Sequence, residues 1–235
     1  DLTPPNTHGV TDAEAAAFDI EPHLISLMWD EPFYSKVLRG ITKKREDSIP
    51  TAGVMVRDGY ITMVWNPHFL TSLVKEGKDK IKGLMIHECL HLVFEHCTER
   101  KHDPHIIWNY ATDCAINSLI PIDYLPNCGI IPGKAFTELT AEQEEKMSPE
   151  AKERYQRMSE FIEGLPKGLS SEEYFALFMQ NDDIKKDLEE QGQSGEGMEG
   201  MPGMDDHDGW GDMSDEDKEL VKGKMRQAIE EAAKE

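Results

Sequence analysis

The strongest apolar pattern lies near the middle of the chain, over residues 84–94. Apolar side chains fill most of its positions: Leu84, Met85, Ile86, Leu90, Leu92, Val93 and Phe94. A helix that is apolar on nearly all sides is typically buried in a core. The pattern predicts a buried helix that opens at Asp79 and carries three polar residues, His87, Glu88 and His91.

Helical patterns also occur on both sides of this segment. Thr11 and Glu14 have the spacing of a capping box and predict a helix from Asp12 to about Trp29, which Pro22 would kink or divide. The expected core face of that helix is Ala16, Ile20, Leu24, Leu27 and Met28. Further helices are predicted over residues 31–40, 67–76, 106–119, 140–164, 170–180 and 214–234.

A hairpin is predicted ahead of the central helix. Thr51–Val56 and Tyr60–Trp65 are rich in strand-forming residues and flank an Asp-Gly pair, which is a hairpin signal. Residues 43–47 are strongly charged and predict a solvated loop. The fold class expected from these patterns is α+β, mostly helical with a small sheet or hairpin.

The net charge of the chain limits the kinds of partner that the protein could bind directly. The net charge of −21 argues against direct binding of nucleic acid or of an anionic membrane surface. No apolar run approaches the length of a membrane span, and the N-terminus does not resemble a signal peptide. Four cysteines without a Cys-x-x-Cys pair predict reduced, buried thiols and a cytoplasmic protein.

Composition also predicts how the chain is divided. Residues 1–10 are expected to be a flexible lead-in, and residues 11–190 a single domain. Residues 191–213 are rich in Gly, Met and acidic side chains and predict a disordered linker. Residues 214–235 then form a C-terminal helix that could contact a protein partner.

The polar residues of the central helix have the spacing of a metal site. His87 and His91 are four residues apart, so they lie about 40° apart on one helix face and can reach one ion. This His-Glu-x-x-His pattern is typical of zinc peptidases, in which the glutamate, here Glu88, is the general base. The alternative is a buried helix whose histidines are satisfied by neighbouring hydrogen bonds.

A hydrolytic zinc site typically has three protein ligands and a position for water. Asp113 is the preferred third ligand. It belongs to a polar stripe, Asn109, Asp113 and Asn117, on the otherwise apolar helix predicted over residues 106–119.

His96 is the alternative third ligand. It follows His87 by nine residues and would lie on the opposite face of a continuous helix. It could bind the same ion only if the helix ended soon after His91, and no Gly or Pro between Leu92 and Glu95 predicts such an end.

The central sequence resembles a known family. The run HECLHLVFEHCTER, followed by HIIWNYATDCAIN, is similar to the putative metallopeptidase domain of bacterial and phage proteins that often precedes a von Willebrand factor A-like domain. The positions that match its motifs are His87, Glu88, His91, His96, Arg100, Trp108, Asn109, Ala111, Asp113 and Asn117. The resemblance covers roughly residues 20–215 and implies a zincin-like fold, with the small sheet beside the active-site helix.

Together the motif and the resemblance predict a zinc-dependent metallopeptidase that cleaves a peptide or protein substrate. His87, His91 and Asp113 would hold Zn²⁺, and Glu88 would be the general base for a metal-activated water. Asn109, Asn117 and Arg100 are expected to orient the ligands through hydrogen bonds. The alternative function is a non-catalytic scaffold on a zincin fold that binds zinc and a peptide or protein.

Overall fold

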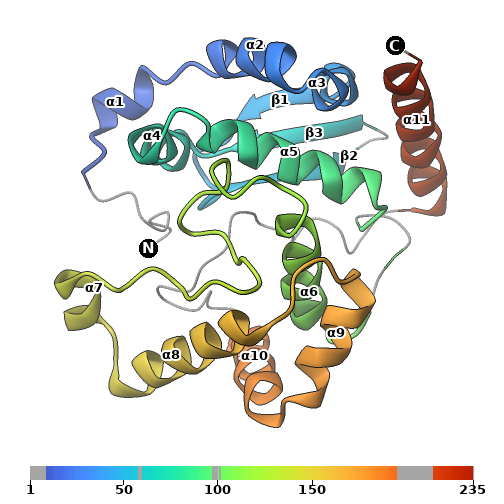
Figure 1. Ribbon diagram of the computed structural model, residues 1–235. Helices are drawn as coiled ribbons and strands as arrows, with labels where there is room; N and C mark the ends of the chain where they lie inside the picture. Colours follow the sequence, from blue (N-terminus) through green and yellow to red (C-terminus); the bar gives the residue numbers. More distant parts are fainter. Residues whose placement is uncertain (1–8, 58–59, 97–99, 101, 195–213, 235) are drawn as a thin grey trace. The chain divides into compact units, whose positions relative to one another are not determined.

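The computed structural model describes residues 9–57, 60–96, 100, 102–194 and 214–234 (Figure 1). This part of the chain contains eleven helices and three strands. It forms two compact units, and the chain passes between them more than once. The first unit takes in the described residues of 1–100, Ile120–Pro126 and 204–235, and the second takes in those of 101–119 and 127–203.

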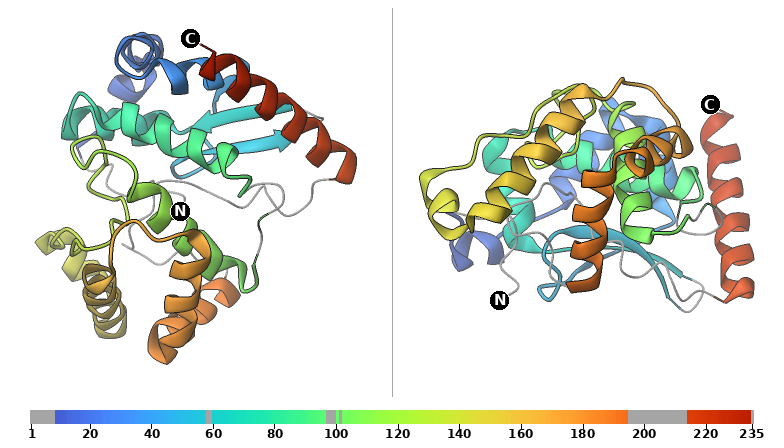
Figure 2. Two further views of the ribbon diagram at one scale, coloured as in Figure 1. Left: turned by 45° about the vertical axis from the view of Figure 1, so that its right-hand side comes forward. Right: turned by 90° about the horizontal axis from the view of Figure 1, so that it is seen from below.

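The first unit combines a small sheet with six helices. Its elements are α1 (Asp12–Ala16), α2 (Glu21–Asp30), α3 (Pro32–Arg39), β1 (Thr42–Arg45), β2 (Ala52–Arg57), β3 (Tyr60–Trp65), α4 (Pro67–Glu76), α5 (Lys80–Val93) and α11 (Asp215–Ala233). The strand order is β1-β3-β2. Figures 1 and 2 show α5 running along one face of this sheet.

The expected hairpin is confirmed. Strands β2 and β3 pair antiparallel with Val54 opposite Met63, and the predicted turn at residues 58–59 lies outside the described residues. β3 alternates between less buried and buried positions near its start, and Met63, Val64 and Trp65 then lie in the core. The sheet thus presents an apolar face to the helices.

The prediction of a loop at residues 43–47 was wrong, because Thr42–Arg45 form strand β1. This strand pairs in parallel with β3, with Lys43 opposite Met63. Its side chains remain largely exposed. Charged residues are common on edge strands, where they discourage pairing with other chains, so the charge of this segment reflected its place at the edge of the sheet.

The first predicted helix is divided, as the position of Pro22 suggested. α1 has the expected capping box between Thr11 and Glu14, and α2 begins again with Pro22 in its first turn. The predicted core face was partly wrong. Leu27 is buried, whereas Met28 is 46% exposed. The break between the two helices shifts the helical phase, so a single stripe cannot describe both.

The second unit is helical in its described part. It contains α6 (His105–Asn117), α7 (Ala141–Lys146), α8 (Pro149–Gly164), α9 (Ser171–Gln180) and α10 (Asp182–Ser194). One core cluster joins α6, α8, α9 and α10 and includes Ile107, Cys114, Met158, Tyr174 and Phe178. The aromatic side chains of α9 are therefore core residues, as the sequence indicated.

α10 was not expected from the sequence. It covers the first residues of the segment that was predicted to be a linker, and residues 195–213 lie outside the described residues. The helix is mostly charged, yet Ile184 and Leu188 are fully buried in the core of the second unit. None of the helices described in this structure is long and apolar enough to cross a membrane.

Candidate metal centre

Helix α5 presents its histidines within a fully buried stretch. Residues from Ile81 to Leu92 are all buried. Gly83 lies so close to the chain at Tyr124 that a Cβ atom would stand 2.0 Å from the Tyr124 carbonyl oxygen. Lys80 Nζ donates to the carbonyl oxygens of Asp123 and Leu125 at 3.0 and 2.9 Å. The segment Ile120–Pro126 is thereby held against the first turns of α5.

Contrary to the expectation of a continuous helix, α5 ends at Val93. Glu95 has a positive φ of 59°, a left-handed conformation that is uncommon in residues other than glycine. The amide of His96 donates to the carbonyl of His91, and that of Glu95 to the carbonyl of Leu92. These two bonds are the Schellman pattern of helix termination. The chain turns here without a Gly or Pro signal.

His87 and His91 face one another across one turn of α5. Their Nε2 atoms are 2.9 Å apart and both side chains are fully buried. Because the helix ends at Val93, His96 folds back and its Nδ1 lies 3.3 Å from Nδ1 of His91. His91 therefore directs one ring nitrogen to His87 and the other to His96.

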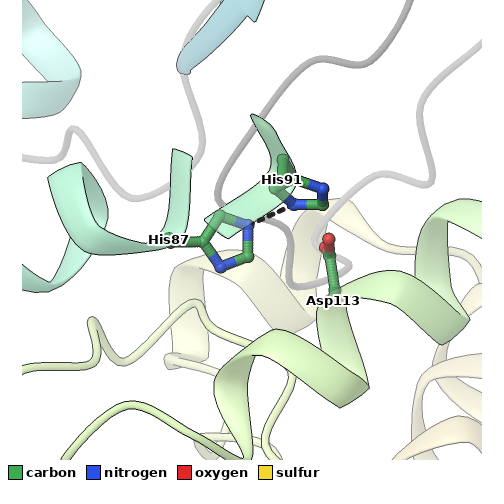
Figure 3. Close-up of side chains that lie close together, drawn as sticks. All are labelled: His87, His91 and Asp113. Carbon is green, nitrogen blue, oxygen red and sulfur yellow. Dashed lines mark hydrogen bonds between the residues drawn. The ribbon is translucent and has the colours of Figure 1, made fainter. Parts of the chain in front are cut away.

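Asp113 of α6 completes a group that could hold a metal ion. One ligand atom from each of His87, His91 and Asp113 lies within 4.8 Å of the other two, and all three residues are buried. Figure 3 shows the Asp113 carboxylate directed toward the two imidazole rings. The group is the one that the sequence analysis preferred, whereas His96 contacts the opposite nitrogen of His91.

Glu88 is fully buried on α5, next to His87. A carboxylate and two imidazoles in an apolar core cost free energy unless hydrogen bonds, ions or opposite charges compensate them. The concentration of such residues at His87, Glu88, His91 and Asp113 therefore indicates a site with a chemical role.

The residues expected to orient the ligands have partners of several kinds. Asn109 Nδ2 lies 3.4 Å from His105 Nδ1. Asn117 Nδ2 donates to the Ile130 carbonyl at 2.8 Å and so fixes the loop that follows α6. The Arg100 amide donates to the Glu95 carbonyl, across the turn that ends α5. His91 also contacts His96, which the sequence offered as an alternative metal ligand.

The cysteines of the described residues are buried. Cys89, Cys114 and Cys128 are buried thiols, as expected for these three, and Cys97 lies outside the described residues. Burial raises the pKa of the Cys89 thiol. Burial, and then the neighbouring charge of Asp113, raise the pKa of Cys114 well above its ordinary value. Neither thiol is poised to act as a thiolate ligand.

Comparisons with known proteins give a similar relative and a family. An uncharacterised protein of Thermotoga maritima is 29% identical over 107 residues, which is 42% of this chain and 25% of that relative. The matched region thus spans about a quarter of the relative's length. No solved structure matches the chain. The model of the putative metallopeptidase domain family matches residues 20–235, nearly the whole chain, and the protein therefore belongs to that family.

Proposed function

We propose that the protein is a zinc-dependent peptidase whose metal is held by His87, His91 and Asp113. The observation that carries the proposal is the buried group formed by these three side chains in a chain of the metallopeptidase family. Two imidazole nitrogens and one carboxylate oxygen are a common ligand set of catalytic zinc, and they leave a fourth position open.

The donor atoms suit zinc better than the alkaline-earth cations. Mg²⁺ and Ca²⁺ prefer oxygen ligands, whereas imidazole suits zinc and other transition metals. Zinc ligands stand about 2.0–2.2 Å from the ion, so pairs of them lie within a few ångströms of one another. The 2.9 Å between the Nε2 atoms of His87 and His91 supports a shared ion.

Each residue of the site has a distinct task in this proposal. When bound, zinc would lower the pKa of water and polarise the carbonyl of the scissile peptide bond. Glu88 would take the proton of the attacking water and pass it to the leaving amine as the carbon–nitrogen bond breaks. His96, at Nδ1 of His91, would hold that ring in the orientation that directs Nε2 toward the metal.

A sheet edge offers a place for the substrate. β2 is an outer strand of the described sheet and packs against α5. An extended peptide can add to such an edge through main-chain hydrogen bonds, which recognise the backbone rather than particular side chains. We therefore infer an unfolded or extended peptide as the substrate class.

The test measures zinc per chain by elemental analysis in the wild type, Asp113→Ala and His96→Ala, all purified with zinc in excess. We expect about one zinc in the wild type and in His96→Ala, and a loss in Asp113→Ala. Loss in His96→Ala together with retention in Asp113→Ala would instead assign three histidine ligands.

Activity is then measured with a mixture of unfolded proteins, and cleavage is read by mass spectrometry. We expect cleavage that a chelator stops and added zinc restores. Zinc-loaded wild type that cleaves nothing in a broad peptide mixture would contradict the peptidase and support a binding scaffold. Wild type that holds no zinc would contradict the metal centre itself.

A further inference from the structure

A pocket of about 620 Å³ opens beside α3 and α11 in the first unit. Figures 1 and 2 show the two helices next to each other, and α3 packs against α11. The side chains that matter for its chemistry are Lys36, Arg39, Lys224, Lys234, Gln227 and Glu231. None of them belongs to the candidate metal centre.

The charge of this pocket is opposite to that of the whole chain. Four of its lining side chains are cationic and one is acidic, which gives a local charge of +3 in a protein whose net charge is −21. An excess of positive charge among the lining side chains attracts anions.

The helix dipoles account for the positions of only some of the four cationic side chains in this pocket. Lys36 and Arg39 occupy the last turn of α3 and Lys234 caps α11, where cations are favoured by the partial negative charge of a helix end. Lys224 lies in the middle of α11, where the dipole has no such effect. It also lies over the Tyr60 ring, 4.7 Å from the centroid, and this contact helps to hold its ammonium group.

We propose that this pocket binds a small polyvalent anion that carries phosphate groups. Its volume falls in the range of sites for small molecules, and it is too small to accept a folded partner. Arg39 offers a planar fork that suits phosphate, and the lysines supply point charges around it. Gln227 adds a neutral amide to the lining, and its Nε2 donates to Glu231 Oε1 at 3.0 Å.

Such a ligand would hold α11 against the rest of the first unit. Val221, Met225 and Ala232 form its buried face, and α11 packs on both α3 and α5. An anion held by Arg39 of α3 and Lys224 and Lys234 of α11 would join the two helices. Its binding should therefore slow hydrogen exchange in the amides of α11, a readout that does not depend on peptidase activity.

The test is a calorimetric titration of the full chain with inorganic pyrophosphate at low salt. Three variants accompany the wild type: Arg39→Gln, Glu231→Gln and Arg226→Gln. Arg226 is an exposed cation of α11 that does not line the pocket, so its variant is the matched control for the loss of one positive charge. Because pyrophosphate also binds metal ions, the zinc content is measured before and after each titration.

The variants should move the dissociation constant in opposite directions. We expect it to rise about fivefold in Arg39→Gln and about 25-fold in Arg39→Gln/Lys234→Gln, and to fall about two- to fivefold in Glu231→Gln. Arg226→Gln should bind as the wild type does. High salt should weaken binding in every protein, because it screens the charges.

The proposal is overturned if pyrophosphate does not bind, if Arg39→Gln binds as tightly as the wild type, or if Arg226→Gln loses as much affinity as Arg39→Gln. Citrate is the comparison ligand, because it has a charge similar to that of pyrophosphate but carries it on carboxylates. Citrate that binds more tightly than pyrophosphate would overturn the assignment to phosphate.

Discussion

The two ring nitrogens of His91 have different neighbours, and from this difference we infer a supporting role for His96 in the proposed site. Nε2 faces His87 at 2.9 Å, while Nδ1 faces His96 at 3.3 Å. A partner at the second nitrogen of a metal-binding histidine fixes the tautomer and the ring orientation. We therefore expect His96 to support His91 from behind the proposed metal centre rather than to bind the metal.

Replacing His96 should therefore weaken zinc binding without removing the site. We expect His96→Ala to bind one zinc at saturation, with an affinity about 10–100-fold lower than that of the wild type. A competition titration with a zinc chelator of known affinity measures the change. An unchanged affinity would show that His91 needs no support from His96.

Glu88 should affect turnover and leave the metal in place. Gln has nearly the same shape as Glu but cannot accept a proton at neutral pH. We expect Glu88→Gln to retain about one zinc per chain and to lose about 10²–10⁴-fold in kcat, the usual contribution of a general base. Side-by-side zinc analysis and peptide cleavage provide the measurement, and turnover close to wild type would refute the role.

At the scale of the element, Gly83 is the residue of α5 that allows the chain near Tyr124 to approach. A Cβ atom there would lie 2.0 Å from a carbonyl oxygen that Lys80 helps to hold in place. We expect Gly83→Ala to lower the free energy of unfolding by about 1–3 kcal/mol, because neither backbone can move away cheaply. Urea unfolding followed by circular dichroism measures the change.

Gly223 is the matched control for that substitution, since it also lies inside a helix. No atom lies within 4 Å of the Cβ position there. Alanine should stabilise the helix by about 0.5–1 kcal/mol, because it reduces the backbone freedom of the unfolded chain. Two variants that shift stability in the same direction would contradict the steric argument.

Glu14 ties α1 to α4 through a charge that depends on pH. Its hydrogen bonds to the Thr11 amide and to Lys75 lower its pKa from 4.5 to about 2. A carboxylate with a lowered pKa stabilises the fold fully above about pH 4.5, and this contribution is lost as the pH falls toward about 2. Glu14→Gln should be less stable than the wild type at pH 7.

The difference between Glu14→Gln and the wild type should shrink steadily from pH 5 to pH 3, as urea midpoints at each pH would show. Glu163→Gln removes one charge from an exposed position in the second unit and serves as the control. A stability difference for Glu14→Gln that grows as the pH falls would contradict the linkage.

These elements also show what the sequence can predict. The His-Glu-x-x-His spacing and the polar stripe on α6 led to His87, His91 and Asp113, because helical periodicity places side chains reliably within each helix. The end of α5 could not be predicted, because Glu95 takes a conformation that favours glycine and only the surrounding contacts compensate its cost.

Two other elements were not predicted, and tertiary contacts again explain why. Thr42–Arg45 becomes a strand only because β3 offers it an edge, and no local pattern reveals that pairing. α10 did carry a signal: Ile184 and Leu188 stand four residues apart, and Asn181 accepts a bond from the Ile184 amide near the start of the helix. The density of charged residues outweighed this weak apolar stripe.

At the scale of the whole molecule, the proposed metal should contribute directly to stability. The three side chains come from α5 and α6, which are separate in sequence, so the unfolded chain does not offer the same group. A ligand that binds only the folded state stabilises it by about 2.7 kcal/mol at 100 times its dissociation constant. Chains of 150–250 residues gain roughly 2–4 °C in Tm per kcal/mol.

Removal of the metal should therefore lower the Tm of the wild type by roughly 5–10 °C, and added zinc should restore it. Thermal unfolding followed by circular dichroism, before and after dialysis against a chelator, measures the shift. Asp113→Ala, which lacks one proposed ligand, should have a Tm that neither chelator nor zinc changes. Mg²⁺ at the same concentration should not replace zinc, because it prefers oxygen ligands and two of the three ligands are imidazoles. An equal response to zinc in the wild type and in Asp113→Ala would mean that zinc stabilises the protein from a different site.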